Sequence, residues 1–93
     1  MSLPMEIRGV DIVVIPAYQP SEILLDLVKD VIAVGYGVIV VDDGSSSDVQ
    51  WIFEQLQTLP DVVVLRHPEN MGKGAALKTA FRYIRELRAP TTY

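Results

Sequence analysis

Short apolar runs alternate along this chain with longer segments in which apolar residues recur every three or four positions. Three runs rich in β-branched residues, at 11–15, 38–41 and 62–65, predict β-strands. Because these runs are apolar without alternation, we expect the strands to be buried on both faces. Pro16 closes the first run, the segment 42–44 closes the second, and a polar stretch from Arg66 to Asn70 closes the third.

The segments between and after the strands predict three amphipathic helices. The first stops at Gly35, a residue suited to a left-handed helix cap, and its apolar positions are Ile23, Leu24, Leu27, Val28 and Val31. The second begins with a capping box of Ser47 and Gln50 and is interrupted by Pro60, and its apolar positions are Val49, Ile52, Phe53, Leu56 and Leu59. The third begins near Lys73 and ends before Pro90, and its predicted buried face is Leu77, Ala80, Phe81, Ile84 and Leu87.

Alternating strands and helices predict an α/β domain in which a parallel sheet lies between helical layers, a three-layer αβα architecture with the order β-α-β-α-β-α. In such sheets ligands bind beyond the carboxyl ends of the strands. Here those ends lead into segments 16–20, 42–47 and 66–74, and all the unusual chemistry of the chain lies in these three loops.

Composition narrows the class of protein. Ninety-three residues form one small domain at most, and the absence of cysteine excludes disulfides and thiolate zinc sites and fits the cytoplasm. No apolar run approaches the roughly 20 residues of a membrane span, and a net charge of −4 argues against nucleic acid as a partner. Residues 1–8 are predicted to be an amino-terminal leader left from expression, and residues 9–93 the domain.

The first two loops combine an aromatic ring with paired acids. The first loop places Tyr18 between Pro16-Ala17 and Gln19-Pro20, and we expect its ring to form a flat surface on which a ligand rests. The alternative is that the Tyr18 side chain only covers the edge of the sheet. Asp42 and Asp43 follow the second strand; we expect Asp42 to cap the turn and Asp43 to accept a hydrogen bond from a nucleobase or ribose. The serines after Gly44 are interpreted as caps, since nothing indicates a catalytic triad.

The third loop brings Gly72, Lys73 and Gly74 to the start of a helix, where backbone amides and the helix dipole favour an anion. It is neither a Walker motif nor a dinucleotide fingerprint. The loop therefore predicts a phosphate or base contact at Lys73, with a solvated first-turn lysine as the alternative.

Taken in order, the segments 14–18, 39–47 and 70–77 resemble the successive signatures that open family 2 glycosyltransferases. The resemblance covers roughly residues 10–85 and implies the GT-A fold, a Rossmann-like architecture of which this chain is the truncated nucleotide-binding half. By that resemblance the nucleotide-binding residues are Pro16, Ala17, Tyr18, Asp42, Asp43, Gly72 and Lys73. Gln19 and Pro20 depart from the Asn and acid that the family usually carries after its tyrosine.

The resemblance also implies a function for a longer parent protein. The parent would transfer a sugar from a nucleotide-diphosphate donor, with a UDP-sugar favoured and a GDP-sugar possible, to a lipid or saccharide acceptor. Its acidic motif for Mg²⁺ or Mn²⁺ and its catalytic base would lie beyond Tyr93, so this chain is expected to bind without turnover, to have no catalytic or metal-binding residue and to need no cofactor of its own. The protein is expected in the cytoplasm, with association of the parent with the cytoplasmic face of a membrane as the alternative.

Two other classes of protein are alternatives to the glycosyltransferase hypothesis. One is a stand-alone nucleotide-binding or assembly module, and the other is a signalling receiver domain. A receiver carries its acid pair after the first strand, whereas here it follows the second. A sheet of three strands is also expected to leave an open edge through which copies associate. The donor-site hypothesis requires Tyr18, Asp43 and Lys73 on one rim, and burial of the acid pair would count against it.

Overall fold

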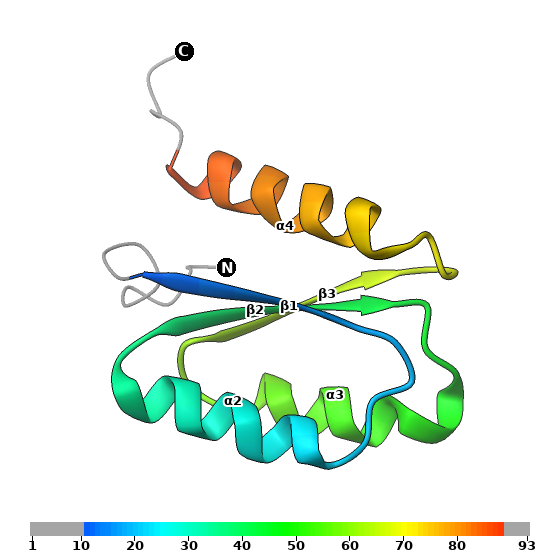
Figure 1. Cartoon of the computed structure of the whole chain (residues 1–93), viewed down its shortest axis with the longest axis horizontal. Coiled ribbons are helices and arrows are strands. Elements are labelled where there is room, and N and C mark those ends of the chain that lie inside the picture. Colours follow the sequence, from blue (N-terminus) through cyan, green and yellow to red (C-terminus); the bar gives the residue numbers. More distant parts are fainter. Residues whose placement is uncertain (1–10, 89–93) are drawn as a thin grey trace.

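A computed structural model describes residues 11–88 as a three-layer α/β domain (Figure 1). The leader predicted at residues 1–8 lies outside the described residues. In chain order the elements are β1 (Ile12–Ala17), α2 (Ile23–Val34), β2 (Gly37–Asp43), the 3₁₀ turn η1 (Ser47–Val49), α3 (Gln50–Gln57), β3 (Val62–His67) and α4 (Lys73–Arg88). Helices α2 and α3 cover one face of the sheet and α4 covers the other, which confirms the predicted order and layers.

The three strands form a parallel sheet in the order β1-β2-β3, so β2 is the central strand. Every residue of β2 is buried, whereas most of β1 and β3 is only partly buried. The expectation that all three strands are buried on both faces is therefore wrong for β1 and β3, because each has a neighbouring strand on one side only among residues 11–88.

The strands are also longer than the sequence predicts, and Pro16 lies inside β1. Gly37 donates its backbone N–H to the carbonyl of Asp11 at 3.0 Å, which fixes which β1 residues face β2. Since backbone groups alternate in direction along a strand, Asp11, Val13 and Ile15 face β2, while Ile12 and Pro16 face the open edge. A proline is tolerated there because its missing N–H takes no bond from the ladder.

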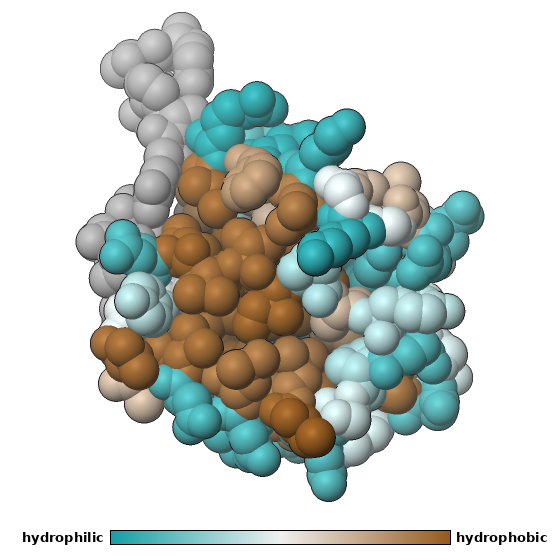
Figure 2. Space-filling view, viewed as in Figure 1, coloured by the Kyte–Doolittle hydropathy of each residue, from teal (hydrophilic) through white to brown (hydrophobic). Residues whose placement is uncertain are grey.

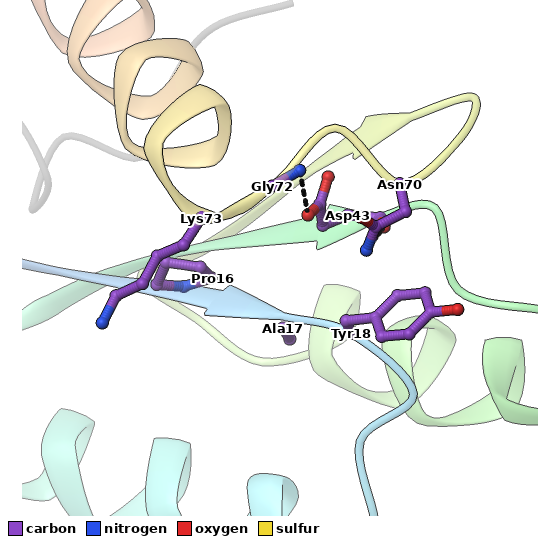
Figure 3. Close-up of a pocket in the computed structure, with 7 residues that line it drawn as sticks. All are labelled: Pro16, Ala17, Tyr18, Asp43, Asn70, Gly72 and Lys73. Atoms are coloured by element: carbon purple, nitrogen blue, oxygen red, sulfur yellow. Dashed lines mark hydrogen bonds between the residues drawn. The ribbon is translucent and has the colours of Figure 1, made fainter.

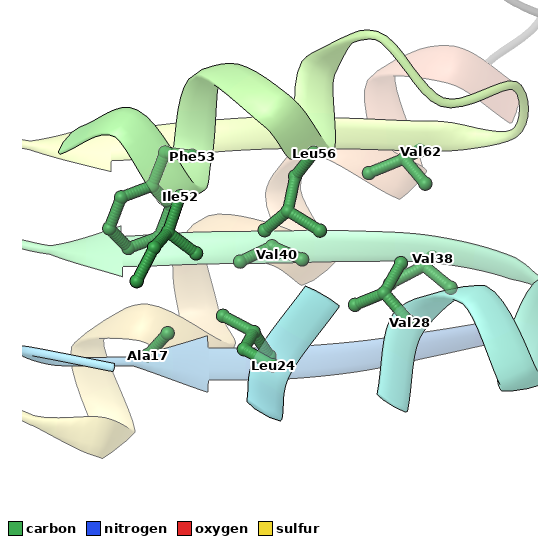
Figure 4. Packing of buried hydrophobic residues seen from close by; sticks show 9 residues of the cluster. All are labelled: Ala17, Leu24, Val28, Val38, Val40, Ile52, Phe53, Leu56 and Val62. Carbon is green, nitrogen blue, oxygen red and sulfur yellow. The ribbon is translucent and has the colours of Figure 1, made fainter. Parts of the chain in front are cut away.

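The core has two halves, one on each face of the sheet. On one face, side chains of α2 and α3 pack against alternate residues of β1, β2 and β3 (Figure 4): Ala17, Leu24, Val28, Val38, Val40, Ile52, Phe53, Leu56 and Val62. On the other face, Ile39 and Val41 of β2 meet Ala76 and Ala80 of α4. The two small alanines let α4 lie close to the sheet, which places its first turn beside the ends of the strands.

Several predicted core positions of the helices are exposed. Phe81 is 58% exposed, Leu27 is 48% exposed and Ile23 is 71% exposed, so these assignments are corrected. The predicted helical period is correct, but α4 turns its alanines toward the sheet, and α2 turns Leu24 and Val28 toward it. Figure 2 shows apolar surface gathered over β1 and the adjoining sides of α2 and α4.

Helix ends are partly as predicted. Gly35 caps α2 in the left-handed conformation at φ 109°. The described part of α4 runs to Arg88, and the predicted stop before Pro90 lies outside the described residues. The capping box is wrong, because Ser47 begins η1 and its side chain makes no cap bond. Gln50 instead reaches back to the carboxylate of Asp42, to which its Nε2 donates at 3.0 Å.

Candidate functional site

The carboxyl ends of the strands border an open pocket of about 540 Å³. Figure 3 shows its lining, which comes from the end of β1, the end of β2 and the loop that leads into α4: Pro16, Ala17, Tyr18, Asp43, Asn70, Gly72 and Lys73. The volume falls within the roughly 300–1,000 Å³ that is typical of small-molecule sites. The pocket is large enough to hold a nucleoside with its phosphates.

Asp43 is the most constrained residue of the pocket. Its Oδ1 accepts the backbone N–H of Met71 at 2.9 Å and a hydrogen bond from Nδ1 of His67 at 2.8 Å. Its Oδ2 accepts the backbone N–H of Gly72 at 2.9 Å. A carboxylate has about four acceptor positions, so within residues 11–88 one position on Oδ2 is left for a ligand.

These contacts stabilise the charged form of the Asp43 carboxyl group. The hydrogen bond from His67, followed by that from Met71, lowers the pKa of Asp43 below its ordinary value, and desolvation opposes them only in part. An ionised Asp43 only accepts, so Nδ1 of His67 carries the proton. Nε2 of His67 lies 2.7 Å from the hydroxyl of Thr79 on α4, so the ring is held between Asp43 and Thr79.

Asp42, the neighbouring acid, faces away from the pocket. Its Oδ1 accepts the backbone N–H of Ser45 at 2.9 Å, and its Oδ2 takes the side-chain amide of Gln50. Arg66 adds a long contact, with Nε 3.8 Å from Oδ2. Asp42 thus shapes the turn after β2, and it does not line the pocket.

Gly44 lets the second and third loops touch. It has φ +78°, and a Cβ placed on it would lie 2.8 Å from the Cα of Glu69 and closer still to the next backbone atoms. Only glycine combines that dihedral angle with so close an approach. The side-chain amide of Asn70 also links the two loops, because its Nδ2 donates to the backbone carbonyl of Asp43 at 3.3 Å.

Gln19 ties the first loop to the second. Its backbone N–H donates to the hydroxyl of Ser45 at 2.9 Å, and its Oε1 accepts the backbone N–H of Ser46 at 2.6 Å. The side chain that departs from the family pattern is therefore used to hold Tyr18 and its loop against the turn after β2.

Tyr18 and Lys73 lie on opposite sides of the buried acid. Tyr18 is 57% exposed and stands at the end of β1, and the Lys73 side chain extends from the first turn of α4 past Pro16 (Figure 3). An exposed aromatic face suits a nucleobase. A lysine at the start of a 16-residue helix suits a phosphate.

The structure brings together six of the seven predicted residues and leaves out Asp42. Both acids are buried, with Asp42 2% and Asp43 4% exposed, which is the outcome the sequence analysis counted against a donor site. The objection applies fully to Asp42. It applies less to Asp43, because the small exposed part of that residue faces the pocket.

Two residues of the site were missed. Asn70 belongs to the third signature, yet nothing in its side chain distinguished it from a loop residue. His67 lies opposite Asp43 in the β2–β3 register, so the predicted strands, extended to their ends, would have paired the two residues.

The residues present do not fit a divalent cation. No group of three or more His, Asp or Glu side chains that could hold a metal occurs within residues 11–88. The carboxylates of Asp42 and Asp43 already accept N–H groups of the protein, which compete with a metal for the same lone pairs. We therefore derive no chemical step through a metal ion from these side chains.

Fold and site together define a parallel α/β domain with a ligand pocket beyond the carboxyl ends of its strands, the class in which many nucleotide-binding proteins are found. The chain belongs to glycosyl transferase family 2, whose family model matches residues 12–86. The match confirms the resemblance seen in the three loop segments, and nothing in it favours a receiver domain. No curated protein and no solved structure matches the chain. In residues 11–88 no helix is both long enough and apolar enough to cross a membrane.

Proposed function

We propose that this chain binds the nucleoside diphosphate of a sugar donor, with a UDP-sugar favoured, for a family 2 glycosyl transfer reaction. The observation that carries the proposal is the pocket itself, in which Tyr18, Asp43 and Lys73 line one cavity although they come from three separate loops. Family membership supplies the class of reaction, and the geometry supports the part of the donor that these residues hold.

The phosphate end of the donor is assigned to Lys73 and the first turn of α4. The helix begins at Lys73, so its free N–H groups and dipole add to the ammonium charge. Among the pocket residues Lys73 is the only cation, and Asp43 is the only anion. The diphosphate therefore lies toward Lys73 and away from Asp43.

The base is assigned to Tyr18 and Asp43. One acceptor position remains on Oδ2 of Asp43, which matches the single imide N–H of uracil, while the Tyr18 ring offers a face for stacking. Guanine also presents N–H donors on its edge, so a GDP-sugar is the second candidate. In both cases the buried carboxylate gains a partner instead of losing one.

We assign binding, and not turnover, to residues 11–88. Neither carboxylate at the strand ends is free to act as a base, since each already accepts protein N–H groups. In the parent protein, transfer to a lipid or saccharide acceptor would use groups that these residues do not supply. If a UDP-sugar incubated with this chain and Mn²⁺ releases UDP above the protein-free rate, this part of the proposal is wrong.

Calorimetric titration tests the binding itself. UDP and GDP are titrated into the chain, and uridine serves as the phosphate-free comparison. Lys73→Ala is expected to weaken UDP binding about tenfold and to leave uridine nearly unchanged, because the lysine contacts phosphate alone. Lys78→Ala is the matched control, since Lys78 is an exposed lysine of the same helix that lies outside the pocket.

The base contact is tested in the same way. Tyr18→Ala is expected to weaken UDP and uridine alike, by roughly tenfold for a lost stacking face. Tyr36→Ala is the control, because Tyr36 is 38% exposed and lies outside the pocket. No heat from UDP or GDP at millimolar ligand, or equal effects of the Lys73 and Lys78 variants, would refute the donor site.

A further inference from the structure

We propose that His67 is a positioning residue of the nucleotide site, which holds the carboxylate of Asp43 in place for the base and joins it to helix α4. The inference rests on the proposed function, because it concerns the same pocket, and it gives a role to a residue outside the pocket lining. His67 ends β3, where it lies opposite Asp43 in the register of the parallel sheet.

The side chain of His67 is enclosed between the sheet and α4. Alternate residues of a strand share a face of the sheet, so His67 projects from the same face as Val63 and Leu65, which pack against the core cluster beneath α4. Only 7% of the His67 side chain is exposed. A buried imidazole requires a hydrogen-bond partner at each ring nitrogen.

The two ring nitrogens of His67 bond different elements. Nδ1 lies 2.8 Å from Oδ1 of Asp43, at the end of β2, and Nε2 lies 2.7 Å from the hydroxyl of Thr79, in α4. An ionised Asp43 can only accept, so Nδ1 donates to it. The Thr79 hydroxyl can donate or accept and therefore suits Nε2 in either protonation state. Because the imidazole ring is rigid, its two bonds fix the carboxylate and the helix relative to each other.

The other two donors to the Asp43 carboxylate come from the loop that leads into α4. The backbone N–H groups of Met71 and Gly72 bond Oδ1 and Oδ2, and Figure 3 draws the bond from Gly72. Both residues belong to one loop, in which Met71 is 56% exposed, so these bonds join the carboxylate to the loop and not to the sheet. Among the described residues, His67 is the donor that reaches this carboxylate from a neighbouring strand.

His67 also determines which carboxylate oxygen is left for the base. The donors from His67 and Met71 occupy both acceptor positions of Oδ1, which leaves the free position on Oδ2. Without His67, Oδ1 would be a buried acceptor that lacks a donor, which is unfavourable. The carboxyl group would then turn or take up a proton, and either change removes the acceptor that the imide N–H of uracil requires.

Two variants separate the two bonds of His67. The side-chain amide of asparagine reaches about as far as Nδ1 of histidine, and that of glutamine reaches about as far as Nε2. His67→Asn is therefore expected to keep the donor to Asp43 and to lose the bond to Thr79. His67→Gln is expected to keep the bond to Thr79 and to lose the donor to Asp43. Each variant removes one buried hydrogen bond, so each is the control for the other.

Calorimetric titration with UDP and with N3-methyl-UDP measures the contact to the base. His67→Gln is expected to weaken UDP binding about tenfold, as for the loss of a hydrogen bond to a charged group. It should change the binding of N3-methyl-UDP little, because the methylated base has no N–H for Asp43 to accept. His67→Asn is expected to bind UDP within about threefold of the unchanged protein, since the donor to Asp43 remains.

Urea unfolding shows whether a loss of fold stability explains the result. His67→Asn, His67→Gln and Thr79→Val, which removes the hydroxyl, should all lower the urea midpoint, because each removes a buried hydrogen bond. Thr79→Val should bind UDP as His67→Asn does, since Asp43 keeps its donor in both. If His67 only stabilised the fold, UDP and N3-methyl-UDP would be weakened to the same extent in both His67 variants.

A measurement without nucleotide separates this inference from the donor site. The carboxyl carbon signal of Asp43, followed by NMR against pH, should show that the pKa of Asp43 rises in His67→Gln and stays low in His67→Asn, because the bond from His67 is the largest cause of the lowered pKa. If the pKa changes in this way and UDP does not bind, the donor site is refuted while the positioning of Asp43 by His67 stands. If the two variants share one Asp43 pKa, or bind UDP equally, the proposal is overturned.

Discussion

Replacing Gly44 by alanine should be far more damaging than replacing Gly35 or Gly74. Gly44 has φ +78°, and the added Cβ would lie 2.8 Å from the Cα of Glu69 and nearer still to the peptide that follows. Those neighbours are backbone atoms that cannot rotate away. The loop that carries Asn70 must therefore move away from the turn after β2.

Two other glycines separate the contributions to this cost. Gly35 has φ +109° but nothing within 4 Å of an added Cβ, so Gly35→Ala tests the backbone angle alone. Gly74, in the first turn of α4, has neither an unusual angle nor a close neighbour, so Gly74→Ala tests the loss of glycine alone.

The expected order follows from these differences. Gly74→Ala should be neutral or stabilise by up to about 1 kcal/mol, because alanine is the better helix residue. Gly35→Ala should cost about 1–2 kcal/mol for the left-handed angle. Gly44→Ala adds about 1–3 kcal/mol for the clash and so reaches roughly 2–5 kcal/mol, a large share of the ~5–14 kcal/mol expected for a 93-residue domain.

Urea unfolding followed by circular dichroism measures all three variants on the same scale. At saturating UDP, Gly44→Ala should also lose more ligand stabilisation than the other two, because the displaced loop carries Asn70, Gly72 and Lys73 of the pocket. A Gly44→Ala variant within about 0.5 kcal/mol of Gly35→Ala would refute the close approach of the two loops.

The remaining predictions concern the paired acids. Because the pKa of Asp43 is lowered in the folded state, its contribution to stability should be complete above the ordinary carboxyl pKa near 4 and lost as pH falls through the folded pKa. Asp43→Asn should therefore flatten the acid side of a plot of urea midpoint against pH. Asp26→Asn, which removes an exposed carboxylate of α2, should leave that side steep. Gln50→Leu should destabilise the domain by about 1.5–3 kcal/mol through loss of the donor to Asp42, and a cost no greater than that of Gln57→Leu, at an exposed position of α3, would contradict this role.

The sequence determined the architecture of this protein because hydrophobic period is a local property. Runs of β-branched residues and helical apolar repeats need only a few neighbouring positions to be recognised, and they gave the correct strand and helix order. The rule that ligands bind beyond the carboxyl ends of parallel strands then located the pocket without coordinates. The resemblance to the family was recognised in the same loops, since each signature occupies a strand end, and the family model matches residues 12–86.

Tertiary structure decided which side of each element faces a neighbour. Phe81 and Leu27 fit their helical periods, yet Phe81 is 58% exposed and Leu27 is 48% exposed, because α4 and α2 turn other residues toward the sheet. The roles of the acids were settled in the same way. Two adjacent aspartates on one strand point to opposite faces, so only the partners brought by the fold, Gln50 for Asp42 and His67 for Asp43, distinguish the residue that shapes a turn from the one that faces the pocket.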